Sequence, residues 1–174
     1  ASLCAGQITC YPCDEGVHIA LVGLHCYPAA VNGIRNALAG GLNVSLKTPL
    51  CSLNKDYRAT VEVAHDLGIR YLTCSGLIPA GNAAESASKS VRLTPEELTE
   101  VLRPAMELAL SHGMEVNFTS PGWLDEDTPT GLGFTQIPSC GACLSNMAVA
   151  PAAPVLPSQS WPPGHGLGHV LRTP

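Results

Sequence analysis

The stretch VNGIRNALAGGLNVSLKTPLCSLNKDY, residues 31–57, contains a helix signal followed directly by a strand signal. The helix signal covers residues 28–39, where apolar side chains recur at helical spacing: Ala30, Val31, Ile34 and Leu38. The two glycines at 40–41 predict the end of that helix. Residues 42–48 then alternate apolar and polar side chains, which is typical of a β-strand with one buried face.

Strand and helix signals also alternate before and after this stretch. Residues 7–11 predict an earlier strand, and residues 69–74 and 114–119 predict two later ones. Between the second and third strands we expect a helix that begins at an N-cap residue, Asn54, and ends at Gly68.

The clearest helix start is the capping box Thr94-Pro95-Glu96-Glu97, which has proline at the first helical position. We expect this helix to end at Gly113 and to be kinked at Pro104, which removes one backbone hydrogen bond. The order of strands and helices predicts an α/β fold with a parallel sheet and right-handed crossovers. Four strands make at most half of a barrel, so we expect a further chain segment or a partner chain to complete it.

Ligands of parallel sheets bind beyond the carboxyl ends of the strands. The residues that the predicted strands bring to that edge are Thr9, Tyr11, Lys47, Thr48, residues 74–78 and residues 119–123. The GLIPAGN loop at 76–82 lies where a nucleotide-like ligand would bind, although a plain surface loop is equally compatible with its composition.

The composition excludes several classes of protein. The chain has 174 residues, of which 45% are hydrophobic and 13% charged, which excludes a wholly disordered chain. Nine basic residues against fourteen acidic ones give a net charge of −5, which argues against nucleic-acid binding. No apolar run approaches the roughly 18 residues of a membrane span, and no signal peptide is visible, so we expect a cytoplasmic protein.

The last third of the chain differs from the rest. Residues 121–174 are rich in proline and glycine and show no helical period. We therefore expect two regions, an α/β region at 1–120 and a small loop-rich extension at 121–174. The eight cysteines allow disulfides by their even number, but we favour reduced thiols and metal chemistry.

The sharpest chemical signal is Cys140-Gly-Ala-Cys143, because a turn can direct both sulfurs toward one metal ion or cluster iron. Two kinds of metal site would include this pair of cysteines. One is a zinc site with His165 and His169 as the further ligands. The other is an iron–sulfur cluster with further cysteines from elsewhere. Two ordinary thiols near a hairpin are the alternative without metal.

The remaining cysteines and histidines give weaker signals. The Cys10-x-x-Cys13 pair, with Cys4 upstream, matches no common cluster motif. We interpret Cys10, Cys51 and Cys74 as small buried hydrophobic residues. Four histidines show no clustered partners in the sequence, and we interpret them as surface or cap residues: His18, His25, His65 and His112.

Four stretches together resemble the C-terminal half of a radical S-adenosylmethionine (radical SAM) protein with a SPASM-type extension. Residues 7–23 look like the fourth barrel strand and the segment after it. Residues 31–57 are similar to the next helix, strand and helix start, and residues 61–83 to the following helix, strand and Pro-x-Gly loop. Residues 137–174 are similar to the start of a SPASM region.

The resemblance implies a partial (β/α) barrel, a [4Fe–4S] cluster and S-adenosylmethionine, and hence an oxidoreductase that modifies a peptide, protein or small-molecule substrate by radical chemistry. It implies S-adenosylmethionine contacts at Thr9, Leu77 and Ile78, and cluster ligands at Cys140 and Cys143. The family's C-x3-C-x2-C motif would lie upstream, so we expect this chain alone to be inactive. No residue is assigned as a catalytic acid or base.

The chain also departs from the family's pattern. Ser158 stands where a cysteine is usual, Ala152-Ala153 where a glycine is usual, and His169 where asparagine is frequent. One alternative reading is a non-catalytic α/β binding module with a structural zinc site in its tail. Another is a divergent relative that binds no metal.

Overall fold

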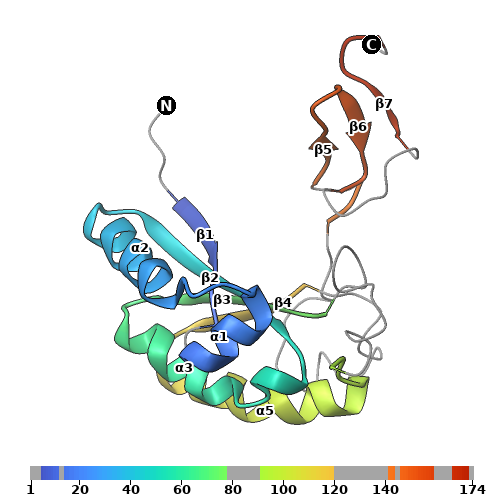
Figure 1. Cartoon of the computed structure of the whole chain (residues 1–174). Coiled ribbons are helices and arrows are strands. Elements are labelled where there is room, and N and C mark those ends of the chain that lie inside the picture. The colour runs from blue at the N-terminus through green and yellow to red at the C-terminus, as the bar shows by residue number, and fades with distance from the viewer. Residues whose placement is uncertain are drawn as a thin grey trace. The chain divides into compact units, whose positions relative to one another are not determined.

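The computed structural model describes residues 5–11, 14–77, 91–119, 141–143, 146–158 and 166–172. The chain divides into two compact units, Ala1–Pro138 and Ser139–Pro174 (Figure 1). The predicted alternation of parallel strands and helices is confirmed in the first unit.

The sheet of the first unit is parallel and has the strand order β1-β2-β3-β4, the same as the order along the chain. Its strands are β1 (Ala5–Thr9), β2 (Asn43–Leu50), β3 (Tyr71–Gly76) and β4 (Glu115–Phe118). The helices are α1 (Glu15–Val22), α2 (Tyr27–Ala39), α3 (Tyr57–Asp66) and α5 (Pro95–Ser111), with a 3₁₀ turn, η1 (Ser52–Asn54).

The helices α2, α3 and α5 pack against one face of this sheet. Each strand is added beside its predecessor in the same direction, so crossovers of one hand place these three helices on the same side (Figure 1). Along β2 the side chains that face the helices are fully buried and the intervening ones are not. The strand side of the core consists mainly of Val44, Leu46, Leu50, Leu72 and Phe118, and the helix side of Ile34, Val61, Leu98 and Leu102.

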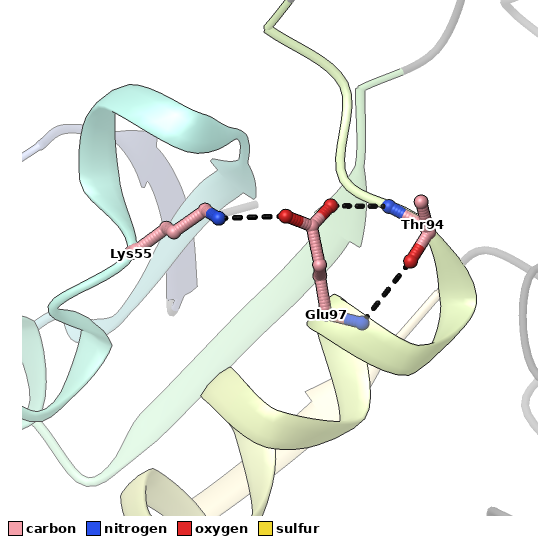
Figure 2. A network of polar contacts seen from close by, with 3 residues as sticks. All are labelled: Lys55, Thr94 and Glu97. Carbon is pink, nitrogen blue, oxygen red and sulfur yellow. Dashed lines mark hydrogen bonds and ion pairs between the residues drawn. The ribbon is translucent and has the colours of Figure 1, made fainter.

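The start of α5 matches the predicted capping box. The Thr94 hydroxyl accepts the Glu97 backbone N–H at 3.2 Å, and the Glu97 carboxylate accepts the Thr94 N–H at 2.9 Å. Figure 2 draws both bonds as dashed lines. These two bonds satisfy backbone donors that the first helical turn leaves without partners. The helix then continues through Pro104 to Ser111 as one element.

The predicted start of α3 is wrong. Its N-cap is Asp56, whose carboxylate accepts the Ala59 N–H, and not Asn54. Asn54 lies buried in η1, where its side-chain oxygen accepts the Cys51 N–H at 2.8 Å and its amide donates to the Pro49 carbonyl at 2.9 Å. Asn54 therefore caps the turn that leaves β2 rather than the helix that follows.

The helix α1 was not expected from the sequence. Its N-cap is Asp14, whose side chain accepts the Val17 N–H at 2.8 Å, and its C-cap is Gly23, with a φ of 79°. Of the helices that the structure describes, none is by itself long and apolar enough to cross a bilayer. Only α1 and α2 taken together meet that test of length and composition, and a bend of 102° separates them.

The second unit holds a small antiparallel sheet with the order β5-β6-β7. Its strands are β5 (Ala148–Val149), β6 (Pro154–Leu156) and β7 (Gly168–His169). This sheet lies within the segment predicted to be rich in loops, and its strands have only two or three residues each.

Candidate functional site: the open face of the sheet

The face of the sheet opposite the helices carries rows of polar side chains. Thr9 pairs in register with Lys47, Lys47 with Thr73, and Thr73 with Asn117, so one row crosses all four strands. All four side chains are exposed or half-exposed. Lys47 has no ion-pair partner among the described residues. The sheet therefore presents hydroxyls, an amide and a cationic amine along one line.

A second polar row lies next to it, toward the amino ends of the strands. Gln7, Ser45, Tyr71 and Glu115 are paired across the sheet in the same way. The Gln7 side-chain amide donates to the Thr73 hydroxyl at 3.4 Å, which joins the two rows. The two rows together place hydrogen-bond donors and acceptors on the open face of the sheet, where they could bind a polar ligand.

An open hollow of about 480 Å³ lies over this second row. Its polar lining comes from all four strands: Gln7, Asn43, Ser45, Tyr71, Thr73, Glu115 and Asn117. Thr9 and Lys47, which the sequence placed at the ligand edge, do not line it. The hollow is nearer the amino ends of the strands than the carboxyl edge where we expected ligands.

At the carboxyl edge of the sheet, side-chain hydroxyls form hydrogen bonds to backbone carbonyls of neighbouring segments. The Thr48 hydroxyl is buried and donates to the Cys10 carbonyl at 3.1 Å, joining β2 to the residue after β1. The Thr119 hydroxyl and N–H both lie within 3.3 Å of the Cys74 carbonyl. Thr48 therefore holds backbone in place rather than facing a ligand.

The remaining ligand-edge candidates lie in different environments. Burial, with smaller contributions from Cys51 and Cys10, raises the pKa of Tyr11 to about 12, so this phenol is neutral at ordinary pH. Leu77 directly follows β3 and is half-buried. Ile78 and Cys140 lie outside the residues that the structure describes.

The prediction that the four histidines are surface or cap residues is confirmed for His25, which is exposed, and for His112, which is the C-cap of α5. It is wrong for His18. His18 is only 2% exposed and lies between Cys10 and Cys26. The rings of His65 and His112 stack with centroids 4.1 Å apart, and His112 Nε2 lies 3.1 Å from a carboxylate oxygen of Glu62. The expectation of no clustered partners is therefore wrong for His18, His65 and His112.

The prediction that Cys10, Cys51 and Cys74 are core residues is confirmed, since each is at most 1% exposed. Burial raises the pKa of the Cys74 thiol to about 12, which keeps it protonated and unreactive. Among the described cysteines, Cys26, Cys51, Cys74 and Cys143 are free thiols.

The predicted metal half-site is described only in part. Gly141 and Cys143 both have positive φ, and Asn146 closes the turn by hydrogen bonds to their backbones at 2.8 and 3.0 Å. Cys143 is exposed. His169 lies in β7, where its Nδ1 accepts the Leu171 N–H at 3.2 Å. His165 falls outside the described ranges, within which no three histidine, cysteine or acidic side chains are placed to hold a metal ion.

No protein-family model matches the chain, and no curated protein matches it in sequence. A function for this chain therefore has to be argued from its residues and its fold.

Proposed function

We propose that this chain is the later part of a radical SAM enzyme. In this proposal β1–β4 form an arc of a partial (β/α) barrel whose inner wall is the open polar face, and residues 137–174 begin a SPASM-like extension. The enzyme would modify a peptide or protein by radical chemistry in the reducing cytoplasm. The four free thiols at Cys26, Cys51, Cys74 and Cys143 agree with such a compartment.

The observation that supports this proposal is the order of the strands in the sheet, together with the placement of the helices on one face. Doubly wound α/β sheets reverse their strand order at a switch point and carry helices on both faces. This sheet keeps the order of the chain, packs α2, α3 and α5 on one face and shows polar rows on the other. Barrels are wound in this way, because each strand–helix unit turns in the same direction around one axis.

The polar face offers groups that fit S-adenosylmethionine. The Thr9 hydroxyl, at the end of β1, suits the polar part of this molecule, and Leu77 with Ile78 would lie against its adenine. When bound, S-adenosylmethionine supplies the precursor of the radical that removes hydrogen from substrate. The residues of this chain would hold and orient it.

The cysteines of this chain do not fit the radical-generating cluster. None of the eight forms a C-x3-C-x2-C triplet. We therefore derive no radical step from these residues. The cluster, and the strands that would pair with β1 at the edge of the described sheet, would come from an N-terminal half or a partner chain.

The turn at Cys143 supports a metal site in the extension. It presents an exposed thiol on a tight, hydrogen-bonded turn, which suits an auxiliary cluster bound through Cys140 and Cys143. The same turn suits zinc with His165 and His169, and His169 would then bind through Nε2 because its Nδ1 already accepts a backbone N–H.

Calorimetric titration with S-adenosylmethionine tests the proposal. The parent chain should bind it, and Thr9→Val should weaken binding about tenfold, which corresponds to one hydrogen bond of roughly 1.4 kcal/mol. Thr99→Val is the matched control, because Thr99 lies on α5 and its hydroxyl donates to the Pro95 carbonyl. Absence of binding, or equal weakening by both variants, would contradict the proposal.

A further inference from the structure

A buried imidazole lies between two thiols in the first unit. His18 Nδ1 is 3.9 Å from Cys10 Sγ, and His18 Nε2 is 3.4 Å from Cys26 Sγ. The rings of Tyr11 and Tyr27 meet His18 edge-on, with centroids 6.1 and 5.5 Å away. The aromatic contacts and the burial of His18 fix the orientation of its ring.

The neighbours of Nδ1 decide which ring nitrogen carries the hydrogen. The Tyr11 backbone N–H points at Nδ1 from 3.4 Å, and a backbone amide can only donate. The Cys10 thiol on the same side can donate as well. Nδ1 is therefore the acceptor, so neutral His18 carries its hydrogen on Nε2 and donates it to the Cys26 sulfur.

Cys26 is placed to benefit from that hydrogen. It is the N-cap of α2, and its side chain makes no capping hydrogen bond. The positive end of a helix dipole and an N–H donor both stabilise a negatively charged sulfur. Cys26 is half-exposed, whereas Cys10 is fully buried. Only Cys26 of the two is thus accessible to a reagent from solution.

We propose that Cys26 is a reversible modification site that takes low-molecular-weight disulfides. The Cys26 thiolate attacks one sulfur of the disulfide, a new sulfur–sulfur bond forms, and the other half leaves as a thiolate that takes a proton from water. The Cys26 sulfur is oxidised by one formal electron and the departing sulfur is reduced by one, so the exchange needs no further oxidant. His18 acts as a positioning residue that stabilises the attacking sulfur.

The geometry also determines the product. A disulfide requires its two sulfurs to be about 2.05 Å apart. Cys10 and Cys26 contact opposite nitrogens of the same ring, so the His18 imidazole separates them. Cys10 therefore cannot resolve the adduct, and the mixed disulfide on Cys26 should accumulate. This site does not depend on the proposed barrel.

The test uses bis(2-hydroxyethyl) disulfide, a small neutral probe, with site-resolved mass spectrometry near neutral pH. Cys26 in the folded chain should react about tenfold faster than the same residue in urea-denatured chain, because only the folded chain places the His18 N–H and the start of α2 at its sulfur. Burial alone would slow a half-exposed thiol. Folding that leaves the rate unchanged or lowers it would overturn the proposal.

Two variants distinguish the contribution of His18 to the Cys26 reaction rate from the effect of folding in general. His18→Gln should bring the Cys26 rate in the folded chain down toward the denatured value, while His65→Gln, a matched change outside the cluster, should leave it unchanged. Circular dichroism checks that each variant is folded, and the comparison of folded with denatured parent stands even if His18→Gln unfolds. A disulfide between Cys10 and Cys26 as the main product would also overturn the proposal.

Discussion

Lys55 Nζ lies 2.7 Å from Glu97 Oε1 and joins the segment before α3 to the first turn of α5 (Figure 2). Glu97 is also the residue that closes the capping box with Thr94. One carboxylate therefore connects the first turn of α5 to Lys55, which lies 42 positions earlier in the chain. Its protonation should change the stability of the fold.

Acid should weaken this connection. The hydrogen bond from Lys55, followed by that from the Thr94 N–H, lowers the pKa of Glu97 below its ordinary 4.5. A lowered folded-state pKa adds stability above the unfolded value, and that stability is lost as pH falls through the folded value. Glu97→Gln should thus lower the free energy of unfolding near neutral pH but not in acid. Urea titrations across this range, with Glu100→Gln as control, check it, and a difference that does not vary with pH would count against it.

The N-cap of α5 should be worth about 1 kcal/mol. Thr94→Ala removes the oxygen that accepts the Glu97 N–H and should lower the free energy of unfolding by about that amount, whereas Thr94→Ser should keep most of it. Thr99→Ala, inside the same helix, should be close to neutral because alanine is the better helix former. Equal losses at the two threonines would show that the cap contributes nothing specific.

The buried hydroxyl of Tyr57 should cost stability. It makes no hydrogen bond of good geometry among the described residues, although Cys74 and Thr48 lie beside it, and Tyr57 is 1% exposed. Tyr57→Phe should therefore raise the free energy of unfolding by about 1 kcal/mol near neutral pH. Tyr71→Phe, at an exposed position of β3, should change it little. A clear loss of stability in Tyr57→Phe would show that the hydroxyl has a favourable partner.

The same residue should contribute to alkaline unfolding. Burial raises the pKa of Tyr57 well above 10.0. A raised folded-state pKa gives stability that is complete below the unfolded value of 10.0 and is lost as pH rises beyond it. Tyr57→Phe should therefore lose less stability than the parent above pH 10, measured by thermal melting. Parallel pH profiles of the two chains would contradict this assignment.

A cysteine at position 158 should improve cluster binding in the extension. Ser158 stands where the SPASM pattern usually has a ligand, so Ser158→Cys should raise the iron and acid-labile sulfide bound after purification without oxygen. Ser111→Cys adds a thiol in the other unit and should not. A zinc equivalent without sulfide would favour the Cys140, Cys143, His165 and His169 site instead, and no gain in iron would argue against the SPASM assignment.

Local signals were sufficient for much of the fold. The Thr94–Glu97 capping box and the glycines 68 and 113 mark helix ends through their own backbone chemistry, and each lies at or beside the observed end. The alternation along β2 also matched its buried face. Such features depend on neighbouring residues, so the sequence alone is enough to place them.

Features that depend on tertiary contacts were missed. The helix α1 is apolar nearly all round and shows no clear amphipathic stripe, so periodicity did not reveal it. His18 contacts Cys10 and Cys26, which lie eight positions before and after it in the chain. These three residues come together only because α1 packs against the end of β1 and the start of α2. Asn54 was misassigned because η1 intervenes between β2 and α3.

The most direct test of the barrel assignment is a nuclear magnetic resonance titration of the labelled chain with S-adenosylmethionine. The account predicts that the largest backbone shift changes fall on the open face and at the end of β3, at Thr9, Lys47 and Leu77, while Arg58 on the outer side of α3 stays unchanged. Shift changes confined to the helical side, or none at any ligand concentration reached, would contradict the claim that the open face is the inner wall of a radical SAM barrel.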